Sequence, residues 1–284
     1  MIVVVALVVA AAAAVRGVWS PCGLSMLSAL NPMSERARGH RFGGTVAWYV
    51  AGAAVGGGLL GAGCALVASG VGRLPLTERW TWAVVLGAAT VAVLSDSALT
   101  RFALPVHPRQ VDERWLSTYR RWIYAGGFGL QIGTGFATYV MTAAVYLTAT
   151  LAALTGSAGH ALLVGLVFGT VRGLAILLAA GARTPDALRA LMAAIDRRAT
   201  TSLLTVAALE AAVGAGAAWF VGGPLAAGAV ALALGTLTAW PSISPGPGRL
   251  FPSIPLGHGE SYWPARRTSS SSTVTTANRG SSTN

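Results

Sequence analysis

Lysine is absent from this 284-residue sequence, and charged residues of all kinds make up only 10% of it. A soluble domain usually carries charge on about a quarter of its residues. Hydrophobic residues are instead 54% of the chain, and they fall in blocks of roughly 20 residues or more, the length of a helix that crosses ~30 Å of hydrocarbon. The blocks lack the alternation of a membrane β-barrel. The sequence therefore predicts an all-α integral membrane protein with the lipid bilayer as its partner.

Clustered metal ligands and nucleic-acid-binding patches are also missing. The four histidines are scattered, and none has a spacing typical of metal ligands. All 20 basic residues are arginines, and most stand in short segments between apolar blocks, where positive charge orients a membrane protein. We therefore expect no nucleic acid, no metal and no cofactor. The arginine-only usage and the richness in alanine and glycine are typical of a bacterial protein from a GC-rich genome.

The apolar blocks predict about seven transmembrane helices. The stretch from Thr201 to Trp240 is too long for one span, because 40 residues give roughly 60 Å of helix. Gly222, Gly223 and Pro224 supply a turn that divides it. The first span lacks a preceding basic segment, so we expect it to stay attached rather than to be a cleaved signal peptide. The predicted spans are 2–30, 43–69, 80–99, 122–152, 159–182, 201–221 and 223–240.

Arginine is distributed unevenly between alternate loops. The segments after spans one, three, five and seven hold 16 arginines, whereas those after spans two, four and six hold two. Since positive loops stay in the cytoplasm, we expect an outside N-terminus and a cytoplasmic C-terminus in the bacterial cytoplasmic membrane. The membrane domain would be 1–240. Residues 241–284 are rich in proline, glycine, serine and threonine and are expected to form a disordered cytoplasmic tail.

Spans one to three and four to six look like two copies of one unit, at about 1–100 and 120–221, with 223–240 as an extra helix. Each unit begins with a long span that contains helix-breaking residues, at 19–23 in one and 126–135 in the other. The second helix of each unit is rich in glycine, which allows close packing in lipid. Because three helices per unit invert the second copy, we predict two inverted three-helix repeats with a mid-membrane site at the paired breaks.

The first break contains one of only two cysteines. Pro21 lacks a backbone donor and should interrupt the helix, and Cys22 follows it well inside the span. A thiol there could face a wet cavity and attack a disulfide as the thiolate. It could equally be a small buried apolar residue. Cys64, on the second span among glycine and alanine, is typical of a packing residue, and a pair with Cys22 would require Cα atoms within about 7 Å.

Four charged residues lie within or near the spans. Such charges are costly in lipid and usually pair or line a pathway. Arg172 and Glu210 are a plausible ion pair, and Asp96 is interpreted as structural. For Arg16 and Arg172, a salt bridge and a polar cavity lining both remain open.

The fourth span carries a polar face formed by Gln131, Thr134, Thr138, Tyr139 and Thr142. Its hydroxyls either bond to carbonyls of their own helix or line a substrate route opposite the broken first span.

One short motif carries a family resemblance. Ser20-Pro21-Cys22-Gly23-Leu24, followed by Asn31-Pro32, resembles the start of the CcdA/DsbD transmembrane family of cytochrome c biogenesis. The resemblance implies two inverted three-helix units and a thiol-disulfide oxidoreductase that carries reducing equivalents from a cytoplasmic thioredoxin-like partner to extracytoplasmic thiols. Cys22 corresponds to the family's first cysteine. The family's second cysteine has no counterpart, because the fourth span reads GGFGLQIGTGFATYV.

Two functions follow from these patterns. The first is a CcdA/DsbD-like redox carrier that uses Cys22. The alternative is a transporter-like protein that moves or binds a small solute, such as an anion, between broken helices one and four, in a cavity lined by Arg16, Gln131 and Thr134. A non-catalytic membrane partner in a larger assembly is a third interpretation.

Overall fold

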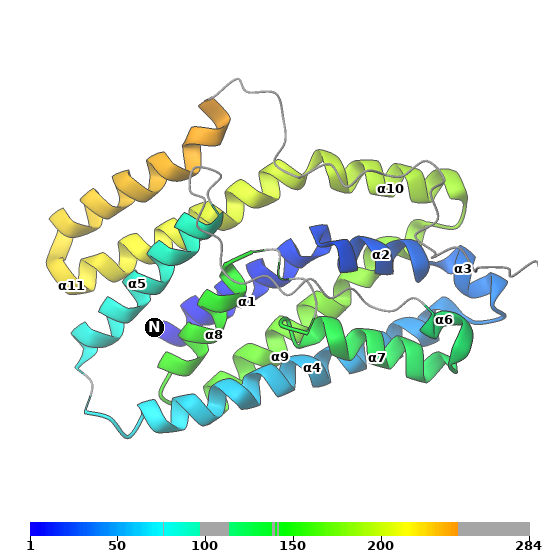
Figure 1. Cartoon of the computed structure of the whole chain (residues 1–284), viewed down its shortest axis with the longest axis horizontal. Coiled ribbons are helices and arrows are strands. Elements are labelled where there is room, and N and C mark those ends of the chain that lie inside the picture. The colour runs from blue at the N-terminus through cyan, green and yellow to red at the C-terminus, as the bar shows by residue number, and fades with distance from the viewer. Residues whose placement is uncertain (76, 97–113, 138–139, 141, 244–284) are drawn as a thin grey trace, which may run out of the picture. The chain divides into compact units, whose positions relative to one another are not determined.

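Helices make up all of the regular secondary structure in the residues that the structure describes. This computed structural model describes residues 1–75, 77–96, 114–137, 140 and 142–243, with only the backbone for 239–243. Figure 1 shows the helices, coloured along the chain. They are α1 (Ile2–Arg16), η1 (Gly17–Trp19), α2 (Pro21–Ala29), α3 (Pro32–Ala37), α4 (Phe42–Val71), α5 (Glu78–Asp96), α6 (Trp115–Thr118), α7 (Arg121–Gly133), α8 (Ala144–Leu154), α9 (Ala158–Leu174), η2 (Ala175–Gly181), α10 (Pro185–Arg197) and α11 (Ala199–Ile243).

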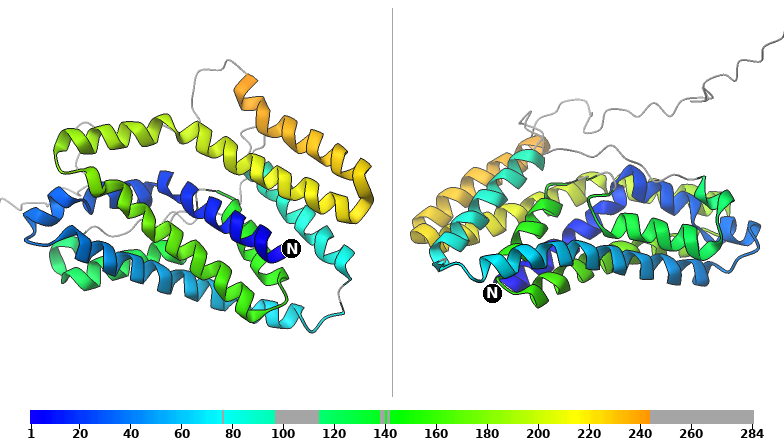
Figure 2. Two further views of the ribbon diagram at one scale, coloured as in Figure 1. Left: turned by 180° about the vertical axis from the view of Figure 1, so that it is seen from behind. Right: turned by 60° about the horizontal axis from the view of Figure 1, so that its bottom comes forward.

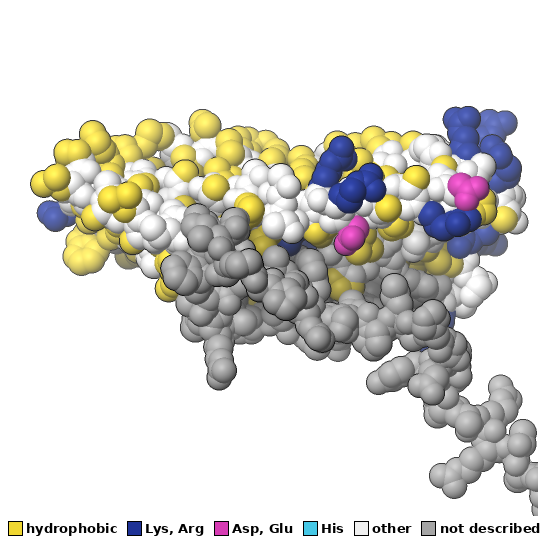
Figure 3. Space-filling model, turned by 90° about the horizontal axis from the view of Figure 1, so that it is seen from above, with side chains coloured by type: hydrophobic (Ala, Val, Ile, Leu, Met, Phe, Trp, Pro, Cys, Tyr) yellow, Lys and Arg dark blue, Asp and Glu magenta, His cyan; other side chains and the backbone are white. Residues whose placement is uncertain are grey.

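Within the described residues, four helical stretches are long and apolar enough to cross a membrane. They are Ile2–Trp19, Phe42–Val71, Ala158–Gly181 and Ala199–Thr238. Large apolar side chains point outward from them, including Leu66 at 78% exposure and Leu225 at 88%. In the face shown in Figure 3, hydrophobic side chains cover much of the surface and arginines gather mainly toward one end. Lipid rather than water suits such a surface, so the chain is a helical membrane protein.

Two of the predicted interruptions are confirmed by the structure. The first apolar block changes from α-helix to a 3₁₀ turn at Gly17 and restarts as α2 at Pro21. The last block turns at Gly223, whose φ of 76° is left-handed and is accessible to glycine without steric cost. Figure 1 shows the two arms of α11 that result.

The interruption predicted at 126–135 in the fourth span is only partly correct, because α7 ends at Gly133 and only Thr134 and Gly135, whose φ is 75°, lie beyond it. Most of that segment is the regular helix α7, and the interruption follows it, between Gly133 and Ala144. The glycines of this segment lie within the helix. Because they have no side chains, α7 can approach α4 closely. A Cβ at Gly129 would lie 2.0 Å from the Tyr49 carbonyl oxygen, and one at Gly133 would lie 2.1 Å from that of Ala53. Close packing between helices thus outweighs the low helix propensity of glycine.

Helix α4 has a second glycine face, which packs on α9. A Cβ at Gly57 would lie 2.3 Å from the Gly165 carbonyl oxygen, and a Cβ at Gly165 would lie 2.4 Å from that of Gly57. We call these two residues, with Gly61 and Gly169, the α4–α9 glycine seam. Figure 2 shows α4 running alongside both α7 and α9. The glycine-rich second helices of the two predicted units are therefore in direct contact.

The remaining packing joins helices from opposite halves of the sequence. Helix α1 packs on α8 and α9, and α5 packs on α11. The predicted tail begins at Pro241, but α11 is helical to Ile243, so its first residues are not tail. The rest of the tail, 244–284, lies outside the described residues, as do 97–99 of the predicted third span.

Candidate functional site

The break in the first span is built by local sequence signals. The Ser20 backbone is extended, and its hydroxyl donates to the Gly17 carbonyl at 2.7 Å and accepts from the Gly23 N–H at 3.1 Å. Ser20 is thus the N-cap of α2, and Pro21 occupies the first helical position, where no backbone donor is needed. Gly23 packs against the backbone of Gly17 and Val18 at the break, whereas Gly17 faces a neighbouring helix without a side chain of its own.

Arg172 of α9 fills the space opposite this break. A Cβ at Gly17 would lie 2.9 Å from Arg172 Nε, so the guanidinium lies against the bare backbone of the break. The residue is only 4% exposed, and its Nε has no hydrogen-bond partner. Its charge lies 5.7 Å from the Phe168 ring centre and interacts electrostatically with Tyr49 and Cys22. A buried cation inside an apolar span therefore lacks a carboxylate partner among the described residues.

A small cavity adjoins Arg172. Its volume of about 20 Å³ is space for about one water molecule. Of the predicted cavity residues, Arg172 lines it, whereas Arg16, Gln131 and Thr134 do not. The lining residues come from both sides of the break and from four neighbouring helical segments, α4, α7, α9 and η2: Gly17, Val18, Gly23, Met26, Leu27, Tyr49, Ile132, Arg172, Ala175 and Ile176.

Cys22 packs beside this cavity in a cluster rich in aromatic rings. The residue is 1% exposed, and its cluster includes Met26, Tyr49, Tyr124 and Phe128. The thiol is therefore buried in apolar surroundings, as in the second of the two sequence interpretations, and it lies within electrostatic range of Arg172.

Cys64 lies in a different part of the core. It belongs to the largest apolar cluster, whereas Tyr49, which packs with Cys22, lies 15 residues earlier on the same helix α4. Fifteen residues of α-helix span about 22 Å, far beyond the Cα separation of about 7 Å that a disulfide permits. The two thiols are not joined by a disulfide. The described arrangement does not bring Cys22 and Cys64 together.

A second polar group forms where the fourth span is interrupted. Asp96, at the end of α5, accepts from the Thr142 hydroxyl at 2.5 Å and from the Ala143 N–H at 2.8 Å. It therefore caps the start of α8, where a negative charge is favourable. Arg16 interacts electrostatically with Asp96, donates to the Ala199 carbonyl at 3.2 Å and lies over the ring of Trp19.

The predicted Arg172–Glu210 ion pair is wrong. Glu210 is fully buried on α11, and neither of its carboxylate oxygens has a hydrogen-bond partner. Glu210 interacts electrostatically with Asp96. The two predicted partners therefore lie in different parts of the core, Arg172 beside the break in the first span and Glu210 within the first arm of α11.

The polar face predicted on span four is only partly described. The Thr134 hydroxyl donates to the Gln131 carbonyl at 2.8 Å, a bond within its own helix end. This favours the first of the two interpretations for Thr134. Thr138 lies outside the described residues.

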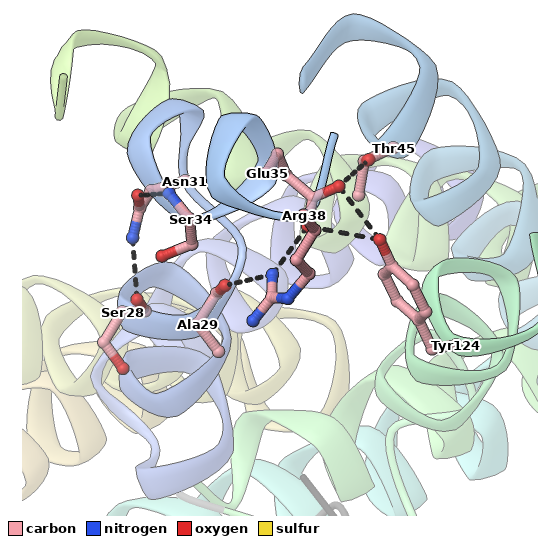
Figure 4. Close-up of polar contacts among 8 residues, drawn as sticks. All are labelled: Ser28, Ala29, Asn31, Ser34, Glu35, Arg38, Thr45 and Tyr124. Carbon is pink, nitrogen blue, oxygen red and sulfur yellow. Dashed lines mark hydrogen bonds and ion pairs between the residues drawn. The ribbon is translucent and has the colours of Figure 1, made fainter. Parts of the chain in front are cut away.

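Sequence reasoning missed a third polar cluster, shown in Figure 4. The fully buried Glu35 of α3 accepts from Arg38 Nη1 at 2.8 Å, from the Tyr124 hydroxyl at 2.9 Å, and from the hydroxyl of Thr45. Asn31 caps α3 by accepting from the Ser34 N–H at 2.9 Å. The Asn31-Pro32 start and the Glu35–Arg38 spacing were local signals for this turn. The cluster fixes the turn after the first span to α4 and α7.

The described residues contain no group of three histidine, cysteine, aspartate or glutamate side chains arranged to hold a metal ion. Fold and site together define a class, the helical membrane proteins with buried charges at interruptions of their helices.

Comparison with known proteins defines the family within this class. The chain is 32% identical over 216 residues to the methylamine utilization protein MauF of Paracoccus denitrificans. The aligned region covers 72% of this chain and 74% of that protein. It is 30% identical over 189 residues to MauF of Paracoccus versutus, or 61% and 64% of the two chains. MauF of Methylorubrum extorquens is 30% identical over 167 residues, 54% of each. No family model and no solved structure matches. The chain belongs to the MauF family.

Proposed function

We propose that this chain serves methylamine utilization as a CcdA/DsbD-like membrane carrier of thiol reducing equivalents, with Cys22 as its reactive group. One observation carries the proposal, namely that Cys22 lies within electrostatic range of the buried guanidinium of Arg172, which packs against Gly17 at the break in the first span. A thiolate is the nucleophile in thiol–disulfide exchange, and a nearby cation favours it electrostatically. The link to methylamine rests on the name of the MauF relatives.

The proposed architecture is two inverted three-helix units and one extra helix, seven spans in all. The helix pairing supports it. The first span packs on the fourth, as α1 with α8, the second on the fifth, as α4 with α9, and the third on the sixth, as α5 with α11. Corresponding helices of two units thus meet each other, as expected for repeats related by an axis in the membrane plane.

The proposed orientation places the arginine-rich segments in the cytoplasm and the N-terminus outside. Figure 1 shows α3, α6 and α10 at one end of the helical unit, and the turn between the arms of α11 at the other. The arginine-rich and arginine-poor loops therefore lie at opposite ends, which supports a cytoplasmic side at α3 and α10.

With a single working cysteine, the exchange proceeds in three substitutions. The Cys22 thiolate attacks a disulfide of an extracytoplasmic protein, forms a mixed disulfide, and releases the other sulfur as a thiolate that takes up a proton. A thiolate of a cytoplasmic thioredoxin-like dithiol then attacks the Cys22 sulfur and releases the reduced protein. The second thiol of that donor frees Cys22, so the donor dithiol loses the two electrons that the acceptor disulfide gains.

Trapping of the mixed disulfide tests this proposal. Membranes would be quenched in acid with a thioredoxin-like bait that lacks its resolving cysteine. We expect a mixed disulfide in the wild type and in Cys64→Ser, the matched control, and none in Cys22→Ser. A bait that forms no adduct with the wild type, or that still forms one with Cys22→Ser, contradicts the redox function.

A second candidate is supported by the same cavity. Arg172 is buried, its Nε has no hydrogen-bond partner among the described residues, and it lines a space beside the break, which suits the binding or transport of a small anionic solute. In this function the guanidinium is essential and the thiol is not.

Growth on methylamine separates the two candidates in a deletion strain complemented with variants. The thiol function predicts that Cys22→Ser and Arg172→Gln both abolish growth. The solute function predicts that only Arg172→Gln does so. Cys64→Ser is expected to grow normally in either case, and normal growth of both Cys22→Ser and Arg172→Gln contradicts both functions.

A further inference from the structure

Glu210 is the most isolated polar side chain in the part of the chain that the structure describes. It lies 11 residues into the first arm of α11, roughly 16 Å from the start of that helix and so near the middle of a ~30 Å hydrocarbon layer. It is 0% exposed, and both carboxylate oxygens lack a hydrogen-bond donor. Val206 and Val213, one turn away on either side, belong to the largest apolar cluster.

Glu35 provides an internal comparison, because it is buried to the same extent. Its carboxylate accepts hydrogen bonds from Arg38, Thr45 and Tyr124, including one from a guanidinium. These donors compensate the loss of water around a negative charge. The surroundings of Glu210 provide no such compensation, so the two glutamates require different charge states.

The charged neighbours of Glu210 do not neutralise it. Asp96 on α5 interacts with it electrostatically, and Arg16 is the charged residue at the end of α1; both helices pack against α11. Asp96 is itself an acceptor for Thr142 and Ala143 and repels a second negative charge. Arg16 donates to Ala199, 11 residues before Glu210 and therefore roughly 16 Å away along the helix.

We propose that Glu210 is a proton-binding site within the membrane, occupied by a proton in this conformation. An uncompensated carboxylate in an apolar interior is far more costly than the neutral acid. Any movement of α11 against α5 that admits water, or that brings Arg16 to the carboxyl, would favour release of the proton. The site uses neither Cys22 nor Arg172, so this inference is independent of the proposed redox and solute functions.

Infrared difference spectroscopy of the full chain in lipid vesicles at neutral pH tests the proposal. The sequence has only nine carboxyl side chains, which makes the carbonyl stretch of a protonated acid readily assignable. We expect one such band in the wild type, lost in Glu210→Gln. The matched control Glu35→Gln and the neighbour variant Asp96→Asn should both retain it. A wild type without the band, or a band that persists in Glu210→Gln, overturns the proposal.

A chemical measurement on the wild type covers the case in which Glu210→Gln does not fold. Dicyclohexylcarbodiimide is apolar and reacts with protonated carboxyl groups to form a stable acylurea. Peptide mass spectrometry is expected to find the adduct on Glu210, at several-fold higher yield than on Glu35. Modification of Glu35 instead, or equal modification of both residues, overturns the proposal.

Discussion

The hydroxyl of Tyr124 on α7 donates a hydrogen bond of 2.9 Å to Glu35 on α3, 89 positions earlier in the chain. Figure 4 shows the two side chains directed toward each other from their helices. The bond joins the turn that follows the first span to the helix that begins the second half of the sequence. It therefore adds a polar link between the two halves of the sequence.

Removal of this hydroxyl should destabilise the protein. Tyr124→Phe removes a hydrogen bond to a buried carboxylate, which is worth about 1.5–3 kcal/mol. We expect a lower thermal denaturation temperature in detergent. Tyr119→Phe is the control, because Tyr119 is 47% exposed and its ring contact with Trp115 persists in phenylalanine. Equal shifts in the two variants would show that the hydroxyl contributes nothing specific.

The α4–α9 glycine seam should not tolerate a methyl group. Gly57→Ala places a carbon 2.3 Å from a backbone oxygen, and relief of this overlap costs about 1–3 kcal/mol or more. Gly63→Ala on the same helix meets no atom within 4 Å, and the better helix propensity of alanine should leave stability unchanged or raise it by up to about 1 kcal/mol. Denaturation midpoints of both variants check this. A Gly57→Ala protein as stable as Gly63→Ala would mean that the helices lie further apart.

Asp96 should control the local stability of α8. Its loss in Asp96→Ala removes bonds to Thr142 and Ala143 at the start of that helix, at a cost of about 1 kcal/mol. We expect faster amide hydrogen exchange in the first turn of α8. Asp186→Ala is the comparison, because its ion pair with Arg189 is largely exposed and contributes little. Unchanged exchange in Asp96→Ala would be inconsistent with a capping role.

The two cysteines should remain separate when the folded protein is oxidised. Treatment with copper phenanthroline is expected to give no intramolecular disulfide between Cys22 and Cys64, because the helix between Tyr49 and Cys64 spans about 22 Å. The same treatment after denaturation serves as the control. Thiol titration and non-reducing peptide mapping would detect the bond, whose formation in the folded state would refute the separation of the two clusters.

The sequence was informative where the signals are local. Apolar blocks are sufficient to predict a helical membrane protein, because backbone groups in lipid have few alternatives to helix. The break at Ser20 and Pro21 was also predictable, since an N-cap and a proline act on adjacent residues. The turn at Gly223 has the same origin.

The predictions that the structure contradicts concern contacts between helices. Gly129 and Gly133 were interpreted as breakers, but their role depends on α4, which lies elsewhere in the sequence. Arg172 and Glu210 were paired from their type and depth, whereas a pair also requires that two helices face each other at those positions. Glu35 was overlooked because it lies in a polar loop, and its burial arises from packing by α4 and α7.

The interrupted fourth span has a consequence for biosynthesis. Helix α7 has 13 residues and α8 has 11, so each is roughly 20 Å long or less and neither can cross ~30 Å of hydrocarbon alone. Insertion of these two segments as the nascent chain emerges therefore depends on a protein surface that is already in the bilayer. Helix α4 is synthesised earlier and supplies the groove that fits α7, whereas α9, which packs on α1 and α4, follows later. Helix α4 is therefore synthesised before α7 and α8, the two short segments whose insertion depends on it.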